Sequence, residues 1–193
     1  LHQAGYKTGL FISPYLETFT DRIQVDFKQI PKEALADFIG RIKYEIDGMV
    51  EDGFNHPTEF ELVTALGFLW FARQEVDIAV IEVGLGGRLD ATNVITPVVS
   101  IITSISFDHT RILGNSLSEI AYEKGGIIKP GVPLVSYPQP PEAEKVLKGL
   151  AEERGCPYYF VAAEQVIEKN ASFNEQHFDF AWKDKRFTDL IIR

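Results

Sequence analysis

Residues 76–93 read VDIAVIEVGLGGRLDATN, and this stretch decides how the rest of the chain is interpreted. It opens with an apolar run, passes through a glutamate and three glycines, and ends in polar residues. A continuous apolar run bounded by turn residues is typical of a strand covered on both faces. In an open parallel sheet, ligands bind outside the carboxyl ends of the strands, so the polar residues after this run are candidates for a site.

On either side of this run, short β-rich apolar segments alternate with longer segments of helical periodicity. This alternation predicts an α/β fold, a mostly parallel sheet flanked by helices. Strands are expected over 7–12, 76–83, 98–105, 132–136 and 158–161. Helices are expected over 31–49, 58–73, 116–123 and 141–154. Polar and aromatic residues alternate over 172–182, which predicts an antiparallel β appendage with one solvent-exposed face.

The composition fits one globular domain, because 45% of the 193 residues are hydrophobic and 24% are charged. The net charge of −9 and the scattered 19 Lys and Arg residues argue against nucleic acid as a partner. Every apolar run is much shorter than the ~20 residues of a membrane span, so no membrane partner is expected. The single cysteine, Cys156, fits a reducing compartment, and we expect a cytoplasmic protein.

Glu82 ends the apolar run, where a carboxylate is costly to bury unless a cation or hydrogen-bond donors meet it. A metal ion could meet it, and so could water or Arg88; the pattern favours neither. The glycines that follow resemble a phosphate cradle but lack the spacing of a P-loop, so a tight turn is the better interpretation. Asp90 and Asn93 are then the candidate polar contacts of the loop.

Other candidates follow the remaining strands and helices. Ser13 follows the first predicted strand, and His109 follows the third, next to Asp108. A lone Asp-His pair is more often a cap or a hydrogen-bonding pair than a magnesium site. Lys124 ends the short helix, where a lysine commonly complements the helix dipole. Phe60, near a helix start, is the aromatic residue best placed to face a ligand.

Taken together and in order, six segments resemble the folylpolyglutamate synthase and dihydrofolate synthase family of the Mur ligase superfamily. They are residues 5–14, 21–23, 57–61, 82–93, 107–110 and 123–129. The likeness covers about residues 1–136, and 82–93 is its most specific part. It implies a P-loop NTPase-like ligase domain, with residues 1–163 as its central part and 164–193 as an extension of the same domain.

The resemblance also implies roles for individual residues. Ser13, Glu82 and His109 match ligands of the catalytic magnesium ions, and Lys124 matches a lysine carried as a carbamate, a further oxygen ligand. Glu82, His109 and Lys124 are also the expected catalytic residues. The pterin portion of the substrate is expected against Thr58, Glu59, Phe60, Glu61, Leu89, Asp90 and Ala91.

The reaction implied is an amide ligation of one-carbon and folate metabolism. ATP, the nucleotide co-substrate, phosphorylates a carboxylate of folate or dihydropteroate, and the amino group of L-glutamate attacks the acyl phosphate. Mg²⁺ would neutralise charge and act as a template. The alternatives are a Mur-type ligase acting on a cell-wall precursor and a non-catalytic binding module derived from such a ligase.

The sequence also departs from the family pattern. Tyr15 stands where the family usually has histidine, and Ser106 where it commonly has glycine. The Gly-Lys-Ser phosphate loop and the C-terminal glutamate-binding domain do not occur in these residues, and the chain opens without Met. It therefore reads as an internal fragment that is inactive alone and prone to self-association, from a parent expected to be monomeric.

Overall fold

The computed structural model describes residues 1–192. It divides into two compact units, Leu1–Ile95 and Thr96–Arg193, and each is described by itself. The division predicted near residue 163 falls inside the second unit, at η5 (Ala163–Gln165). Within residues 1–192 no helix combines the length and the apolar character needed to cross a membrane.

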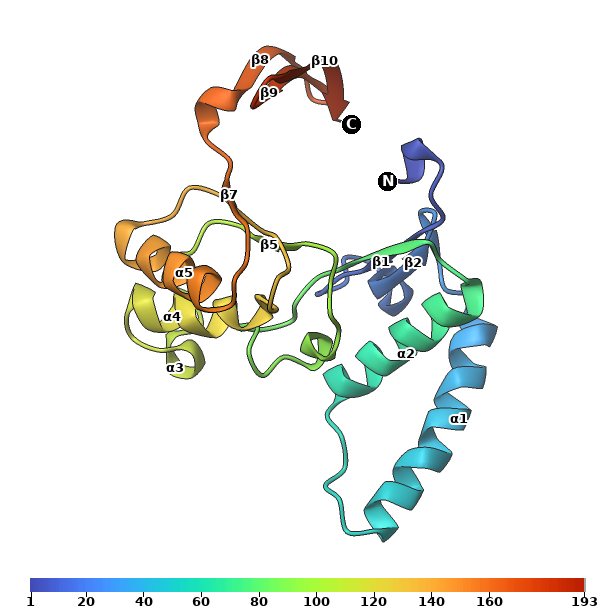
Figure 1. Ribbon diagram of the computed structural model, residues 1–193. Coiled ribbons are helices and arrows are strands. Elements are labelled where there is room, and N and C mark those ends of the chain that lie inside the picture. The colour runs from blue at the N-terminus through green and yellow to red at the C-terminus, as the bar shows by residue number, and fades with distance from the viewer. Residues whose placement is uncertain (193) are drawn as a thin grey trace. The chain divides into compact units, whose positions relative to one another are not determined.

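The first unit is built on a four-stranded sheet of order β3-β2-β1-β4. Its strands are β1 (Thr8–Phe11), β2 (Ile23–Val25), β3 (Lys28–Gln29) and β4 (Ile78–Ile81). Its helices are η1 (His2–Ala4), η2 (Phe19–Arg22), α1 (Lys32–Glu51), α2 (Glu59–Gln74) and η3 (Ala91–Val94). β1 runs antiparallel to β2 and parallel to β4, so the carboxyl ends of β1 and β4 lie at the same edge of the sheet (Figure 1).

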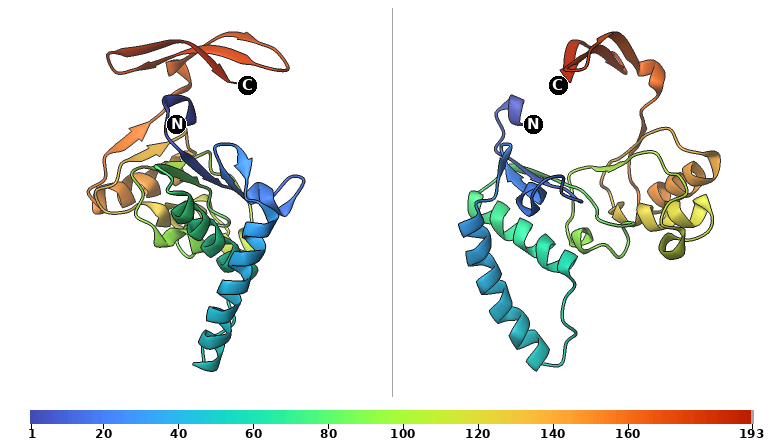
Figure 2. Two further views of the ribbon diagram at one scale, coloured as in Figure 1. Left: turned by 90° about the vertical axis from the view of Figure 1, so that its right-hand side faces the viewer. Right: turned by 180° about the vertical axis from the view of Figure 1, so that it is seen from behind.

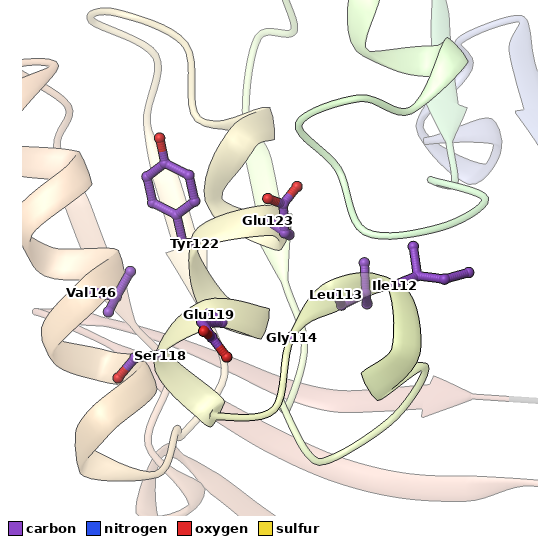
Figure 3. Close-up of a pocket in the computed structure, with 8 residues that line it drawn as sticks. All are labelled: Ile112, Leu113, Gly114, Ser118, Glu119, Tyr122, Glu123 and Val146. Carbon is purple, nitrogen blue, oxygen red and sulfur yellow. The ribbon is translucent and has the colours of Figure 1, made fainter.

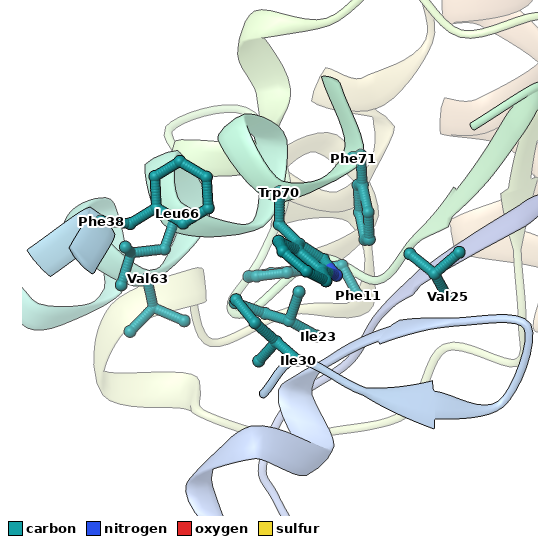
Figure 4. Packing of buried hydrophobic residues seen from close by; sticks show 9 residues of the cluster. All are labelled: Phe11, Ile23, Val25, Ile30, Phe38, Val63, Leu66, Trp70 and Phe71. Carbon is teal, nitrogen blue, oxygen red and sulfur yellow. The ribbon is translucent and has the colours of Figure 1, made fainter. Parts of the chain in front are cut away.

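The core of this unit lies between the sheet and the two long helices. Side chains from β1, β2, α1 and α2 meet in one apolar cluster (Figure 4), which comprises Phe11, Ile23, Val25, Ile30, Phe38, Val63, Leu66, Trp70 and Phe71. Close approach of α2 to β1 requires Gly67, because a Cβ there would lie 2.7 Å from Cδ2 of Phe11. Burial of this many large side chains is the main stabilising term for the unit.

The second unit contains a parallel sheet of order β5-β6-β7 and an antiparallel sheet of order β10-β9-β8 (Figure 2). The parallel strands are β5 (Ser100–Ile102), β6 (Leu134–Ser136) and β7 (Tyr158–Phe160). The antiparallel strands are β8 (Val166–Ala171), β9 (Gln176–Trp182) and β10 (Lys185–Ile192). The helices are α3 (Thr110–Leu113), α4 (Leu117–Lys124), η4 (Gly125–Ile127) and α5 (Pro141–Glu153).

The predicted α/β fold and its antiparallel appendage are confirmed, and the five predicted strands and four predicted helices all occur. The β2–β3 hairpin and the short helix α3 were not predicted from the sequence. The expectation that the apolar strands are covered on both faces is wrong in part. Val80 in β4 is 46% exposed, because one face of that strand is incompletely covered in the described chain.

Candidate functional site

Ser13 and Glu82, two predicted magnesium ligands, lie together at one edge of the first sheet. Phe11 pairs with Ile81 in the parallel β1–β4 ladder, so the residues after both strands emerge side by side. The Ser13 amide donates a hydrogen bond of 2.9 Å to Oε2 of Glu82, and the Glu82 amide donates one of 2.9 Å to the Phe11 carbonyl. The peptide bond between Ser13 and Pro14 is cis.

This pair supplies hard oxygen donors in an accessible place. The Glu82 side chain is exposed. Ser13 binds the Glu82 carboxylate through its backbone amide and also carries a hydroxyl. A hydroxyl and a carboxylate are the donor types that Mg²⁺ accepts in proteins. The donor set therefore fits the metal that the resemblance implies, although it supplies only part of a coordination shell.

The glycine loop after Glu82 is organised by Asp90. Oδ2 of Asp90 accepts a hydrogen bond from the Leu85 amide at 2.9 Å. Oδ1 accepts from the Thr92 amide at 2.9 Å and from the Thr92 hydroxyl at 2.5 Å, so Asp90 caps η3. The Asn93 side chain donates to the Arg88 carbonyl at 3.1 Å. Asp90 thus holds the loop in shape, and the neighbouring Leu89 is 81% exposed.

The predicted pterin segment 58–61 forms the start of α2 and contacts the same loop region. Thr58 and Glu61 make a reciprocal capping box: the Glu61 amide donates to the Thr58 hydroxyl at 3.2 Å, and the Thr58 amide donates to Glu61 Oε2 at 2.7 Å. The Thr58 amide and hydroxyl hold the pKa of the Glu61 carboxyl below its usual value. Glu59, at the first helical position, is exposed.

Phe60 joins this segment to the glycine loop. A Cβ added to Gly84 would lie 2.4 Å from Cζ of Phe60, so the bare backbone of the loop packs directly on the aromatic ring. The ring also meets Phe11 edge-on, with 6.1 Å between centroids. η3 packs against α2, which brings the 89–91 region to the same helix. The structure therefore gathers both predicted pterin segments within the first unit.

His109 and Lys124 belong to the second unit. His109 takes a left-handed conformation with φ of 48° at the start of α3, and its amide donates to Oδ1 of Asp108 at 2.7 Å. Nε2 of His109 lies 3.7 Å from Oδ2 of Asp108. The hydrogen bond between these two residues is therefore made by the backbone amide, and the His109 side chain makes no capping hydrogen bond to α3.

Lys124 is the last residue of α4, which begins at the capping box of Ser116 and Glu119. The turn after it packs tightly, because a Cβ on Gly125 would lie 2.4 Å from Cδ1 of Leu150 in α5. The Arg154 guanidinium donates to the Gly125 carbonyl at 3.2 Å, which fixes this turn further. Lys124 is half-buried at a rigid helix end.

A pocket of about 470 Å³ lies beside α3 and α4 in the second unit (Figure 3), and the sequence did not predict it. It is lined by Ile112, Leu113, Gly114, Ser118, Glu119, Tyr122, Glu123 and Val146. Glu119 is engaged in the cap of α4, so the lining is partly structural. No predicted site residue lines the pocket.

Of the four predicted ligands, Ser13 and Glu82 belong to the first unit, where they share a hydrogen bond, and His109 and Lys124 belong to the second. Within residues 1–192, no group of three or more His, Cys, Asp or Glu side chains is arranged to hold a metal ion. The predicted magnesium site stays a prediction.

Comparison with solved structures defines the class to which this fold belongs. A complex of folylpolyglutamate synthase with AMPPCP matches with a TM-score of 0.92 at 34% identity, over 99% of this chain and 48% of that one. A folylpolyglutamate synthase from Thermotoga maritima matches with a TM-score of 0.84 at 36% identity, over 97% of this chain and 43% of that one. The described chain therefore has the fold of part of a folylpolyglutamate synthase, an ATP-dependent ligase.

Curated relatives identify the family. The dihydrofolate synthase/folylpolyglutamate synthase of Bacillus subtilis is 40% identical over 98% of this chain, and the folylpolyglutamate synthase of Lacticaseibacillus casei is 37% identical over the whole of this chain. No family model matches the sequence. Over nearly its whole length, the chain is homologous to folylpolyglutamate synthase/dihydrofolate synthase. It spans about 45% of the length of these two relatives.

Proposed function

We propose that this chain forms part of an ATP-dependent ligase that joins L-glutamate to folate or dihydropteroate. The γ-phosphoryl group of ATP passes to a carboxylate of the pteridine substrate and ADP leaves. The glutamate amino group then attacks the acyl carbon, and inorganic phosphate leaves as the amide forms. The observation that carries the proposal is the Ser13–Glu82 hydrogen bond at the carboxyl ends of two adjacent parallel strands.

In this proposal the chain contributes metal ligands and the pterin contacts. Ser13 and Glu82 would hold Mg²⁺ together with His109 and a carbamylated Lys124. When bound, the ion neutralises phosphate charge during transfer. The Ser13 amide orients the Glu82 carboxylate through the 2.9 Å hydrogen bond. Phe60 would present an aromatic face to the flat pterin ring, beside Thr58, Glu59, Glu61, Leu89, Asp90 and Ala91.

The test is an assay of the protein at its full natural length with ATP, Mg²⁺ and L-glutamate, using dihydropteroate and tetrahydrofolate in parallel. We expect glutamylated product with at least one of them. Glu82→Gln keeps the shape and the acceptor for the Ser13 amide but removes the charge, so product formation should fall at least a hundredfold. Full activity of Glu82→Gln, or turnover of neither substrate by the wild type, would contradict the proposal.

The printed 193 residues alone should not turn over ATP, because they contain no Gly-Lys-Ser phosphate loop. A purified sample of these residues that makes glutamylated product would overturn this. The cytoplasmic location and the monomeric parent stay predictions; relatives such as the folylpolyglutamate synthase of Bos taurus are named mitochondrial. The relatives' names favour the folate ligase over a cell-wall ligase.

A further inference from the structure

The guanidinium of Arg22 lies over two neighbouring aromatic rings close to the end of β1. Its central carbon lies 5.1 Å from the ring centroid of Tyr15 and 5.7 Å from that of Phe19. Its Nε atom is buried and has no hydrogen-bond partner among the residues that the structure describes. An unpaired buried donor in a charged group costs free energy and demands an explanation. A ligand that binds the guanidinium would provide one.

The carboxylate next to Arg22 in the sequence is already saturated. One oxygen of Asp21 accepts from the amides of Glu17 and Thr18 at 2.8 and 3.0 Å. The other accepts from the Thr18 hydroxyl at 3.1 Å and from the Gln29 side chain at 2.5 Å. The two amides hold the pKa of the Asp21 carboxyl below its usual value. These bonds make η2 a rigid support for Arg22.

This support places Arg22 beside the candidate site. The Ile12 amide donates to the Arg22 carbonyl at 3.0 Å, so Arg22 lies opposite the residue that precedes Ser13. Tyr15, which carries the closer of the two rings, follows Ser13 by two residues. Ser13 in turn is bound to Glu82. A cation, a hydroxyl and a carboxylate thus gather at one edge of the first sheet.

We propose that Arg22 binds an oxyanion of a substrate, either a carboxylate or a phosphoryl group, next to Ser13 and Glu82. The inference rests on the proposed function, in which both reacting groups are oxyanions that repel each other. The planar fork of a guanidinium matches either group through paired hydrogen bonds. Cation–π contact with Tyr15 and Phe19 holds the guanidinium beside this end of the sheet.

The test is calorimetric binding to the protein at its full natural length, as wild type and as Arg22→Met. The probes are Mg²⁺ with AMPPCP, dihydropteroate with its free carboxylate, and the uncharged carboxamide of dihydropteroate. We expect Arg22→Met to weaken one oxyanion probe at least tenfold and to bind the carboxamide within twofold of wild type. A loss confined to dihydropteroate identifies the carboxylate as the ligand, and a loss confined to AMPPCP identifies the phosphoryl group.

Two further variants separate binding from folding. Arg41→Met removes a matched arginine, which lies 6.0 Å from the Phe38 ring but is paired with Asp37 at 3.2 Å; it should bind every probe within twofold of wild type. Arg22→Lys keeps the charge without the fork and should weaken the same probe at least threefold with an unchanged melting temperature. If Arg22→Met does not fold, the affinities of Arg22→Lys test whether Arg22 binds the oxyanion.

Two outcomes overturn the assignment of Arg22. In the first, Arg22→Met binds both oxyanion probes within twofold of wild type. In the second, the carboxamide loses as much affinity as the acid, which indicates a general disturbance of the site. A wild-type protein that binds none of the three probes would instead contradict the proposed function, on which the assignment depends.

Discussion

A single methyl group at position 84 should disturb the pterin segment and the core together. The Cβ of Gly84→Ala would lie 2.4, 2.7 and 2.8 Å from three atoms of the Phe60 ring, whereas carbon atoms ordinarily stay about 3.5 Å apart. The ring must therefore move by about 1 Å. It cannot move freely, because it rests against the fully buried Phe11.

The cost follows from this geometry. Overpacking a well-packed site costs about 1–3 kcal/mol. Phe60 is half-buried and can yield towards solvent, so we expect Gly84→Ala to lower the free energy of unfolding of the first unit by about 1–2 kcal/mol, in the lower part of that range. Gly40→Ala is the matched control, because its methyl group meets no atom within 4 Å. Alanine is the better helix former, so that variant should gain up to about 1 kcal/mol.

Urea unfolding followed by tryptophan fluorescence measures both changes. The chain has two tryptophans, Trp70 in the first unit and Trp182 in the second, so a Trp182→Phe background reports the first unit alone. Combining Gly84→Ala with Phe60→Leu should recover part of the loss, because the smaller side chain clears the methyl group. The reasoning is refuted if Gly84→Ala is as stable as wild type, or if the two substitutions are strictly additive.

Three other predictions concern different parts of the chain. Ser116→Ala removes the capping box shared with Glu119 and should cost about 1 kcal/mol in urea unfolding. Lys169 holds the pKa of Asp179 below its ordinary value of 3.8, so this carboxylate stabilises the antiparallel sheet fully above that pH and progressively less below it. Asp179→Asn should therefore make the stability of the second unit, measured by Trp182 fluorescence, depend less on pH in the acid range. Leu89→Ala, at an exposed side chain, should raise KM for the pteridine substrate and leave the melting temperature unchanged.

The sequence predicted the regular elements well, because their signals are local. Ser116 and Glu119 specify the start of α4 by their own hydrogen bonds, and a three-residue spacing is enough to recognise them. The β2–β3 hairpin escaped prediction because its strands have three and two residues, too few for a period to show. Its turn uses Asp26 and Phe27 with positive φ, a conformation that Phe rarely adopts and that its identity does not signal.

Only the part of the site that directly follows predicted strands could be predicted from the sequence. Glu82 and Ser13 each follow an apolar run, and the parallel pairing of β1 with β4 brings them together, as we expected. The contact of Arg22 with Tyr15 and Phe19 could not be foreseen, because it depends on the shape of the 14–21 loop. The Asp21 carboxylate sets that shape, because it accepts hydrogen bonds from the Glu17 amide within the loop and from the Gln29 side chain in β3.

Several residues that the family resemblance assigns to substrate already have a full structural role. Asp90 uses both oxygens within the glycine loop, and Thr58 and Glu61 satisfy each other at the start of α2. A ligand that took these groups would have to replace bonds that hold the chain in shape. Selectivity for the pteridine substrate should therefore come from the neighbours that these bonds position, the half-buried ring of Phe60 and the exposed Leu89. Asp90, Thr58 and Glu61 would then act on the substrate mainly by keeping that surface in place.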